Sequence, residues 1–253
     1  MRKIFLFFVL TVILLMKTNG AYGGRPFMTE DAGVAGKGVM QLELGSEYAK
    51  QSNGENESSL QFVPIYGVTD WMELSAELPY KFAEDSGNDD MNGFEDMLLG
   101  LKTQILKEER APALLLKTVV KFDNGDESNG LGSGDMDIGF VAAATKRIGD
   151  LTLHANIGYT FVGNDFDPNF TNYILYGVAG EYSFKEKINL MAEIYGESNS
   201  HFHIGAFKQH DLQTLLGLTY QLTEKIILDS GIKIGLLENS PDLGLTLGLS
   251  INF

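Results

Sequence analysis

The chain has 253 residues, no cysteine and a formal net charge of −15 at pH 7. Such acidity argues against nucleic acid as a partner, because basic surfaces bind the phosphate backbone. Without cysteine there is no disulfide framework. An exported chain of this size therefore gains its stability from a core, from closure of a sheet or from lipid.

Residues 1–20 have the layout of a secretory signal peptide. Arg2 and Lys3 precede an apolar run over residues 4–16, and small residues follow around Gly20 and Ala21. The run is too short to cross a bilayer as a helix, so cleavage near Gly20 or Ala21 is expected rather than an uncleaved anchor. Because this segment holds three basic residues and no acid, the remainder carries a charge of −18.

The dominant pattern after residue 20 is the alternation of apolar and polar residues. In the final segment, the odd positions from 243 to 253 are apolar and the even positions are small or polar. A strand of this kind fits lipid on one face and a polar interior on the other. The pattern recurs over 40–48, 72–80 and 151–161, and further runs centre on residues 62, 101, 117, 140, 178, 192, 216 and 231.

The connections between these runs alternate in length. Short ones fall near 68–70, 107–110, 147–150, 185–187 and 223–225, and long ones at 51–58, 81–93, 123–134, 163–172, 198–210 and 237–242. Short turns face the periplasm and long loops the exterior in bacterial outer-membrane barrels. The pattern predicts an all-β, transmembrane antiparallel β-barrel of about twelve strands, with both termini periplasmic, in the outer membrane of a Gram-negative bacterium.

The barrel is expected to span residues 38–253, after the signal peptide and an N-terminal segment, 21–37. A soluble β-sandwich also alternates, but uniform strand lengths and alternating connections favour the barrel. Tyrosines near strand ends agree, because aromatic residues form girdles at both membrane interfaces. These tyrosines are Tyr48, Tyr80, Tyr159, Tyr173, Tyr182 and Tyr220.

Four stretches carry a resemblance to a known family. They are Arg-Pro-Phe-Met-Thr-Glu-Asp-Ala at 25–32, Tyr-Gly-Val-Thr-Asp-Trp-Met-Glu-Leu at 66–74, Phe-Glu-Asp-Met-Leu-Leu-Gly-Leu-Lys at 94–102 and Gly-Leu-Gly-Ser-Gly-Asp at 130–135. They resemble the MetA-pathway of phenol degradation family over most of the chain, although the family's usual Asp-Asp-Ala is Glu30-Asp31-Ala32 here. The resemblance implies an outer-membrane transporter, and the family name is no evidence that this barrel handles phenol.

The N-terminal segment 21–37 is a candidate lumen plug, because it is rich in glycine and carries Arg25, Glu30 and Asp31. We expect Arg25 to pair with interior carboxylates. Many glycines also share the interior phase of the strands, which indicates either a lumen with room for solute or plug, or relief of strain in a closed sheet.

Interior charges supply the candidate binding residues. Lysines on the predicted fourth and fifth strands form a basic strip between acidic walls, and Lys121 is expected to lie near Asp135 and Asp137. The strip either orients polar solutes through its field or belongs to a salt-bridge network that stiffens the barrel. The candidate lumen-lining residues are Arg25, Asp31, Glu43, Glu73, Glu77, Lys102, Lys117, Lys121, Asp137, His154, Glu181 and Glu193.

We expect a conduit for small solutes, aromatic or hydrophobic ones included, with no catalytic residue, metal or cofactor. Two alternatives stand: a filled structural or adhesive barrel with acidic loops, and a surface lipase that uses His154, although no Gly-x-Ser-x-Gly elbow occurs. His201 and His203, with Glu197 and His210 nearby, do not supply four metal ligands in fixed geometry. Expected partners are outer-membrane lipid and lipopolysaccharide, and the barrel-assembly machinery through Phe253, whose position resembles the C-terminal signal of barrel proteins.

Overall fold

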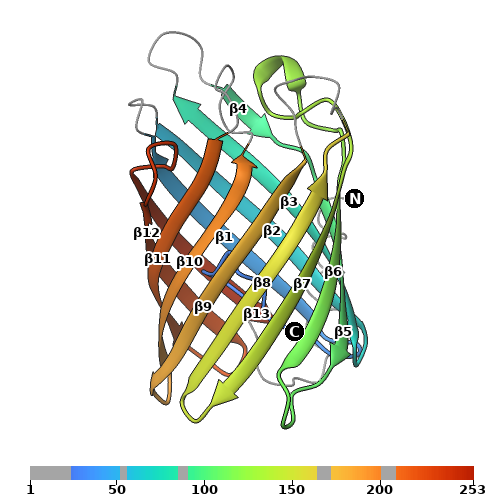
Figure 1. Ribbon diagram of the computed structural model, residues 1–253, viewed down its shortest axis with the longest axis vertical. Coiled ribbons are helices and arrows are strands. Elements are labelled where there is room, and N and C mark those ends of the chain that lie inside the picture. Colours follow the sequence, from blue (N-terminus) through green and yellow to red (C-terminus); the bar gives the residue numbers. More distant parts are fainter. Residues whose placement is uncertain (1–23, 52–55, 85–90, 164–171, 201–208) are drawn as a thin grey trace, which may run out of the picture.

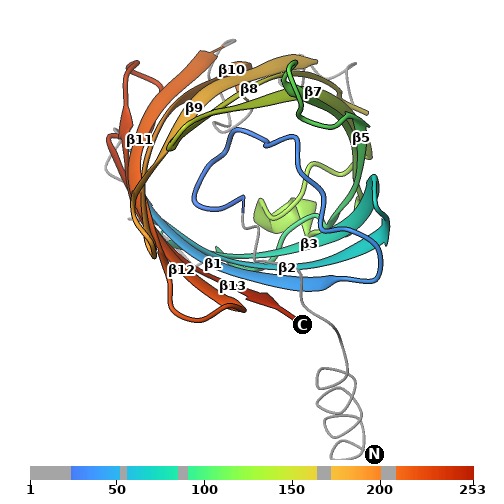
Figure 2. The same cartoon turned by 90° about the horizontal axis from the view of Figure 1, so that it is seen from below.

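A closed antiparallel sheet forms the molecule (Figures 1 and 2). The computed structural model describes residues 24–51, 56–84, 91–163, 172–200 and 209–253. Within them the strands are β1 (Met40–Lys50), β2 (Asn56–Thr69), β3 (Met72–Glu84), β4 (Met91–Phe94), β5 (Leu98–Leu106), β6 (Ala113–Lys121), β7 (Asp137–Ile148), β8 (Leu151–Phe161), β9 (Tyr173–Lys185), β10 (Ile188–Ser200), β11 (Gln209–Gln221), β12 (Ile226–Gly235) and β13 (Leu243–Asn252).

The sheet closes because each strand pairs with the next along the chain and β1 pairs with β13. β4 and β5 both pair with β3 and follow one another along it, so together they form a single strand of the wall. The thirteen strands of the sheet therefore make a barrel of twelve, and the predicted fold class is confirmed.

The connections sort by length to the two ends of the barrel. Residues 70–71, 107–112, 149–150, 186–187 and 222–225 lie at one end, which we call the turn end. The longer connections lie at the opposite end, the loop end, and the one between β6 and β7 holds a short 3-10 helix, η1 (Glu127–Asn129) (Figure 1). β3 continues to Glu84 and β4 begins at Met91, so the connection expected at 81–93 spans only residues 85–90.

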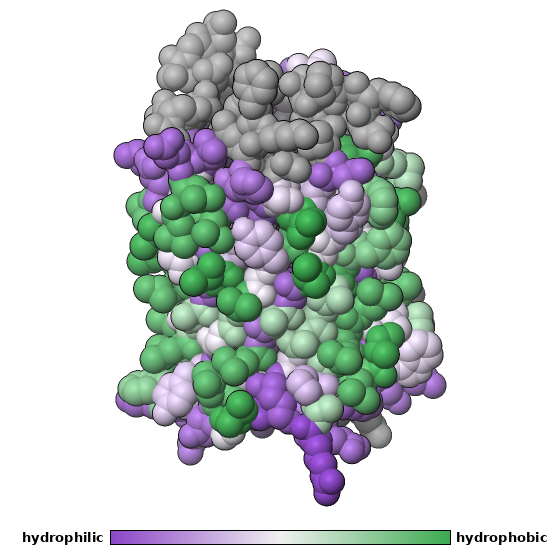
Figure 3. Space-filling model, in the orientation of Figure 1, coloured by the Kyte–Doolittle hydropathy of each residue, from purple (hydrophilic) through white to green (hydrophobic). Residues whose placement is uncertain are grey.

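The alternation in sequence becomes two faces of the wall. Along β8 every odd-numbered residue is exposed on the outside and every even-numbered residue, from Thr152 to Thr160, is buried on the inside. The outer surface consequently carries a broad apolar band that gives way to polar residues at the turn end (Figure 3). This band is the surface that faces the hydrocarbon of the membrane. A closed sheet can lie there because its strands hydrogen-bond to one another all the way round.

Most of the tyrosines expected at the membrane interfaces lie on the outer face. Tyr48 and Tyr159 are exposed toward the loop end, and Tyr182 and Tyr220 toward the turn end. The expectation for Tyr173 is wrong: this residue shares the inward side of β9 with Gly177 and Ala179, because strand residues two apart face the same way.

No helix in the described ranges is long and apolar enough to cross a membrane. The predicted signal peptide, residues 1–20, lies outside the described residues, and so do His201 and His203.

The N-terminal segment, described from residue 24, folds back into the barrel before β1 begins (Figure 2). Gly36 and Gly38 adopt φ values of 82° and 79°, which only glycine reaches without strain, and they turn the chain at the turn end. The turn is fixed to β2, because the Gly38 N–H donates to the Gly67 carbonyl at 2.7 Å and the Gly67 N–H donates to the Val39 carbonyl at 2.9 Å. A side chain at Gly67 would overlap the carbonyl oxygen of Gly36.

The outward face can be tested with Leu247, which is 64 % exposed in the middle of β13. Replacing it with arginine, Leu247→Arg, places a charge in hydrocarbon and is expected to lower the free energy of unfolding by about 2–4 kcal/mol. Urea unfolding from lipid vesicles, followed by the fluorescence of the only tryptophan, Trp71, measures the change. Leu247→Ala is the control, and equal stability of the two variants would contradict a lipid-facing position.

Candidate functional site

The N-terminal segment, residues 24–37, loops through the lumen inside the ring of strands (Figure 2). Each wall strand except β4 offers this segment at least one contact residue. The contacts are with Gly45, Gln61, Glu73, Lys102, Lys117, Thr145, His154, Gly177, Glu193, Gly217, Asp229 and Thr246, in order from β1 to β13. A segment without strand structure is thus held from all sides by side chains of the wall.

Arg25 joins the segment to β2, β12 and β13, on both sides of β1. Its guanidinium donates to Gln61 Oε1 at 2.8 Å and to Thr246 Oγ1 at 2.9 Å, and its Nε lies 3.7 Å from an oxygen of Asp229. Side chains at Gly45 or Gly248 would overlap the guanidinium. These two glycines therefore provide the space that the arginine occupies.

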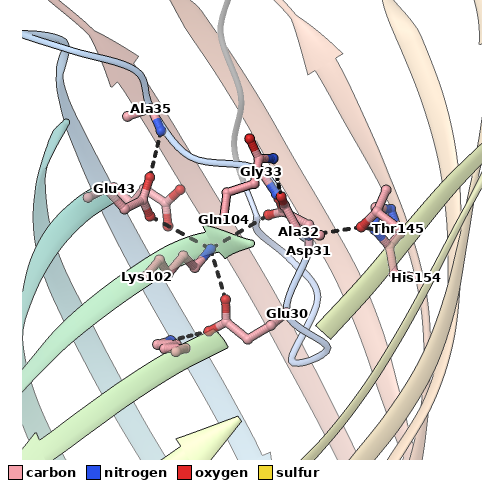
Figure 4. A network of polar contacts seen from close by, with 12 residues as sticks. Glu30, Asp31, Ala32, Gly33, Ala35, Glu43, Lys102, Gln104, Thr145 and His154 are labelled. Carbon is pink, nitrogen blue, oxygen red and sulfur yellow. Dashed lines mark hydrogen bonds and ion pairs between the residues drawn. The ribbon is translucent and has the colours of Figure 1, made fainter. Parts of the chain in front are cut away.

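Glu30 is the centre of the ionic contacts (Figure 4). Lys102 and Lys117 lie directly opposite one another on β5 and β6, a placement that is unfavourable for like charges. The Glu30 carboxylate lies between them: one oxygen is 2.8 Å from Lys102 Nζ and the other accepts a hydrogen bond from Lys117. Glu73 and Asp31 lie 3.7 and 3.8 Å from the same Lys102 ammonium. The negative charge that these lysines need is supplied largely by the N-terminal segment.

Carboxylates of the wall bind the backbone of the segment in return. Glu193 accepts hydrogen bonds from the N–H groups of Met28, at 3.0 Å, and of Thr29. Glu73 accepts one from the Ala35 N–H at 2.6 Å. Backbone N–H groups away from water need such acceptors, so these two glutamates replace the partner strand that the segment lacks.

A small apolar contact completes the fit. Ala32, which is 1 % exposed, packs with Val34 against Ala113, Leu115 and Ala143 on the inner faces of β6 and β7. Burying even a few methyl groups stabilises the packed segment, so this patch adds an apolar contribution to the ionic contacts.

His154 lies beside that contact, under the segment. Its Nδ1 is 3.0 Å from Thr145 Oγ1, which accepts the Ala32 N–H at 2.8 Å, and its ring lies 5.7 Å from the ring of Phe27. Gln104 closes the group by donating to the Ala32 carbonyl at 2.6 Å. The histidine therefore helps to shape the lumen wall and faces away from lipid.

The remaining predicted lumen residues all lie on the inner side of the wall. Lys121 is 2.7 Å from Asp137, which lies opposite it in the register of β6 and β7. Glu43 accepts from the Gln41 amide at 2.8 Å, and Glu181 accepts from the Asn189 amide at 2.5 Å. Glu77 lies on the inward side of β3, two residues before Pro79. Each lysine of the predicted basic strip thus has a carboxylate within 2.8 Å, or, for Lys117, in direct hydrogen-bond contact.

Several contact residues were not among the candidates from sequence. Asp229 lies near Arg25, and Lys233 of β12 pairs with Glu47 at 2.6 Å. The alternation in sequence could have identified Lys233, because it stands between the apolar residues Ile232 and Ile234, which face outward, and therefore faces the lumen. Glu30 and Gln61 were harder to find, because their role depends on where a non-periodic segment lies.

The described residues contain no group of three or more histidine, aspartate and glutamate side chains that could hold a metal ion. Of the four residues weighed for such a site, Glu197 and His210 are described, and the two other histidines are not.

The apolar band, the polar interior and the closed sheet define a β-barrel of the outer-membrane type, with a folded segment in its lumen. The chain belongs to the MetA-pathway of phenol degradation family, whose model matches residues 23–253. The resemblance inferred from the four sequence stretches is thereby confirmed.

Solved structures agree on the fold. The COG4313 outer membrane channel from Pseudomonas putida F1 is 15% identical, with a TM-score of 0.72 over 92% of this chain and 100% of that one. The KdgM porin in complex with oligogalacturonate is 10% identical, with a TM-score of 0.57 over 84% of this chain and 99% of the porin. No curated protein matches the chain by sequence.

The fit of the segment can be tested on β9. A side chain at Gly177 would overlap Thr29 Oγ1, so Gly177→Val is expected to displace the segment. A single cysteine, Ala32→Cys, reports the displacement, because the wild-type chain has no thiol and Ala32 is buried. We expect maleimide labelling to be about tenfold faster, which corresponds to a shift of about 1.4 kcal/mol.

The control is Gly180→Val on the same strand. Gly180 faces outward, and a Cβ there would meet its first neighbour at 3.6 Å. Equal labelling of both variants would show that Gly177 is not a point of close approach.

Proposed function

We propose that this barrel is a channel for small solutes whose conduction is limited by the N-terminal segment, residues 24–37, acting as a plug. The observation that carries the proposal is the contact of this segment with nearly every wall strand at a level where the lumen is otherwise lined by paired charges. The segment is held mainly by ionic and hydrogen-bond contacts and only by a small apolar patch, so water that enters the lumen can take over some of its polar partners when the segment moves.

The solutes that we propose are small, and aromatic or hydrophobic ones are included, as the family description suggests. The candidate residues of the lumen would then be positioning residues. Lys102, Lys117 and Glu30 set the charge at the narrow level, and Arg25 and Glu193 hold the segment in place. The termini are proposed to be periplasmic, with the loop end outward, following the rule for short turns and long loops.

A catalytic role is not part of the proposal. The lipase alternative requires a histidine toward the lipid, and His154 is 8 % exposed on the inward side of β8, in contact with Thr145. The filled structural barrel remains the second candidate, because the same ring of contacts that suggests a plug also occupies the lumen.

Deleting residues 22–34 distinguishes the channel from the filled barrel. The deletion removes Arg25 and Glu30 and leaves the turn at Gly36 and Gly38, so the barrel itself is expected to fold. We expect single-channel conductance in planar bilayers to rise severalfold, and liposomes containing the variant to swell faster in arabinose.

The matched control keeps the length and removes the contacts: residues 22–34 are replaced by thirteen glycine and serine residues. This variant should conduct between the wild type and the deletion, because a flexible segment obstructs the lumen without being anchored. Unchanged conductance and swelling in both variants would refute the plug and favour the filled barrel.

A further inference from the structure

The basic side chains of the lumen are already neutralised. Ion pairs with nitrogen-to-oxygen distances of 3.7 Å or less join six of them to carboxylates of the wall or of the N-terminal segment. These six are Arg25, Lys81, Lys102, Lys117, Lys121 and Lys233. A charged solute in the lumen therefore meets little free positive charge from them.

The carboxylates are not balanced in the same way around the barrel. Four consecutive strands, β8 to β11, contain one lysine or arginine in their sequences, Lys185, which is the exposed last residue of β9. The inward sides of β9, β10 and β11 carry Glu181, Glu193, Glu197 and Asp211. This side of the wall thus has carboxylates but no cation of its own within the lumen.

Two of the four carboxylates have donors of their own. Glu193 accepts the backbone N–H groups of Met28 and Thr29, and Glu181 accepts the Asn189 amide at 2.5 Å. Hydrogen bonds to N–H donors spread and stabilise the charge of a carboxylate. The charge that remains least compensated on this side belongs to the other two.

Glu197 and Asp211 lie directly opposite one another. They are register partners on β10 and β11, and they share the inward phase of the buried residues Tyr195 and Gln213. Like charges at opposite positions of neighbouring strands are unfavourable. One oxygen of Asp211 accepts the Gln213 amide at 2.7 Å, whereas its Oδ1 atom is buried and has no donor within the described part of the chain. The pair therefore presents negative charge with a single amide to stabilise it.

The aromatic side chain beside the pair is suited to a cation as well. Tyr195 donates its hydroxyl to Gln213 Oε1 at 2.9 Å, so its ring is held in one orientation. The ammonium of Lys233 lies over this ring, 6.0 Å from the centroid. Because the face of an aromatic ring attracts cations, the wall next to the two carboxylates also favours positive charge.

The pair lies on the loop-end side of the N-terminal segment. Lys233, the register partner of Leu215, contacts the sulfur of Met28 at 3.8 Å and so marks the level of the segment. β11 runs from the loop end toward the turn end, and Asp211 comes four residues before Leu215. A solute that enters from the loop end consequently meets Glu197 and Asp211 before it meets the segment.

We propose that Glu197 and Asp211 make this channel selective for small cationic solutes, which they attract to the loop-end side of the segment. Fixed charges inside a narrow lumen raise the local concentration of ions of opposite sign, and acidic side chains in a pore favour cations. The inference rests on the proposed channel function. It adds the charge of the solute and the residues that select it.

Reversal potentials of single channels in planar bilayers test the selectivity. The KCl gradient is kept at low ionic strength, because salt screens the fixed charges. We expect K⁺ to be more permeant than Cl⁻ by about tenfold. In the variant Glu197→Gln/Asp211→Asn the permeability ratio should fall by about threefold or more, because other carboxylates of the lumen remain.

Two further variants keep the test decisive. Glu186→Gln/Glu224→Gln removes the same charge from exposed turns after β9 and β11, and it should leave the ratio at the wild-type value. Glu197→Lys gives Asp211 a basic partner across the register, as Lys121 has in Asp137, so it neutralises the pair without leaving a lone carboxylate. It should lower the ratio as much as the double variant. A wild-type ratio near one, or wild-type selectivity in both Glu197 variants, would overturn the proposal.

Glucosamine hydrochloride, used in place of KCl, extends the test to a cation of the size of a solute. We expect the sign of the reversal potential to be that of a cation-selective channel, and a potential dominated by chloride would overturn the class of solute. The channel proposal is judged separately, by the conductance of the variant that lacks residues 22–34. A channel that conducts without preferring cations would refute the selectivity alone, and no current from either the wild type or the deletion would refute both.

Discussion

Two lysines that face each other across neighbouring strands set the central constraint of this molecule. Lys102 and Lys117 are register partners on β5 and β6, inside a closed sheet where bulk water is limited. The register of the sheet fixes their backbone positions, so their ammonium groups share one region of the lumen. Their repulsion is relieved by one carboxylate, that of Glu30, which reaches them from outside the strand order. The wall and the N-terminal segment therefore depend on one another electrostatically.

The remaining contacts of the segment follow from this arrangement. Once Glu30 is fixed, the residues before it run along the inner face toward β12, β13 and β2, where Arg25 contacts Asp229 and two neutral acceptors. The residues after it return toward the turn end past Glu73. Arg25 and Glu30 carry opposite charges, so the segment neutralises both signs of the wall. Breaking either contact leaves a buried charge without its partner, which costs more than the pair contributed.

The glycines of the inner face show two different physical causes. At Gly45, Gly177 and Gly248 an added side chain would collide with Arg25 or Thr29, so close approach of the segment requires glycine there. At Gly139 and Gly231 the first obstacle is a threonine of the neighbouring strand, 3.1 Å away. Those positions concern packing within the sheet itself, and both interpretations of the glycine pattern therefore apply, at different places.

Sequence periodicity predicts what depends on neighbours in the chain. It placed the last strand at 243–253, against 243–252 observed. It also put Lys121 near Asp135 and Asp137, because a strand register carries over a loop, and the structure pairs Lys121 with Asp137. It could not place Glu30, since the segment that holds it has no period. It also missed the break between β4 and β5 at Asp96, because the run centred on residue 101 continues into polar residues that resemble a loop. The role of Asp96 depends on the backbone N–H groups that it accepts from the connection between β6 and β7, and the sequence does not show where that connection lies.

The contacts of Glu30 and of Asp96, which periodicity does not reveal, lie at levels of the barrel with different chemistry. Around Glu30 the lumen presents paired charges, which retain water and resist apolar solutes. The Asp96 carboxylate instead accepts three backbone N–H groups and lies 3.6 Å from Lys121, and apolar residues flank it, from Leu131 inside to Phe94 outside. Glu30 thus balances the charges of the wall, whereas Asp96 also fixes the backbone of a connection. Each carboxylate is understood only with the segment that it contacts in place, because neither contact follows from the period of a strand.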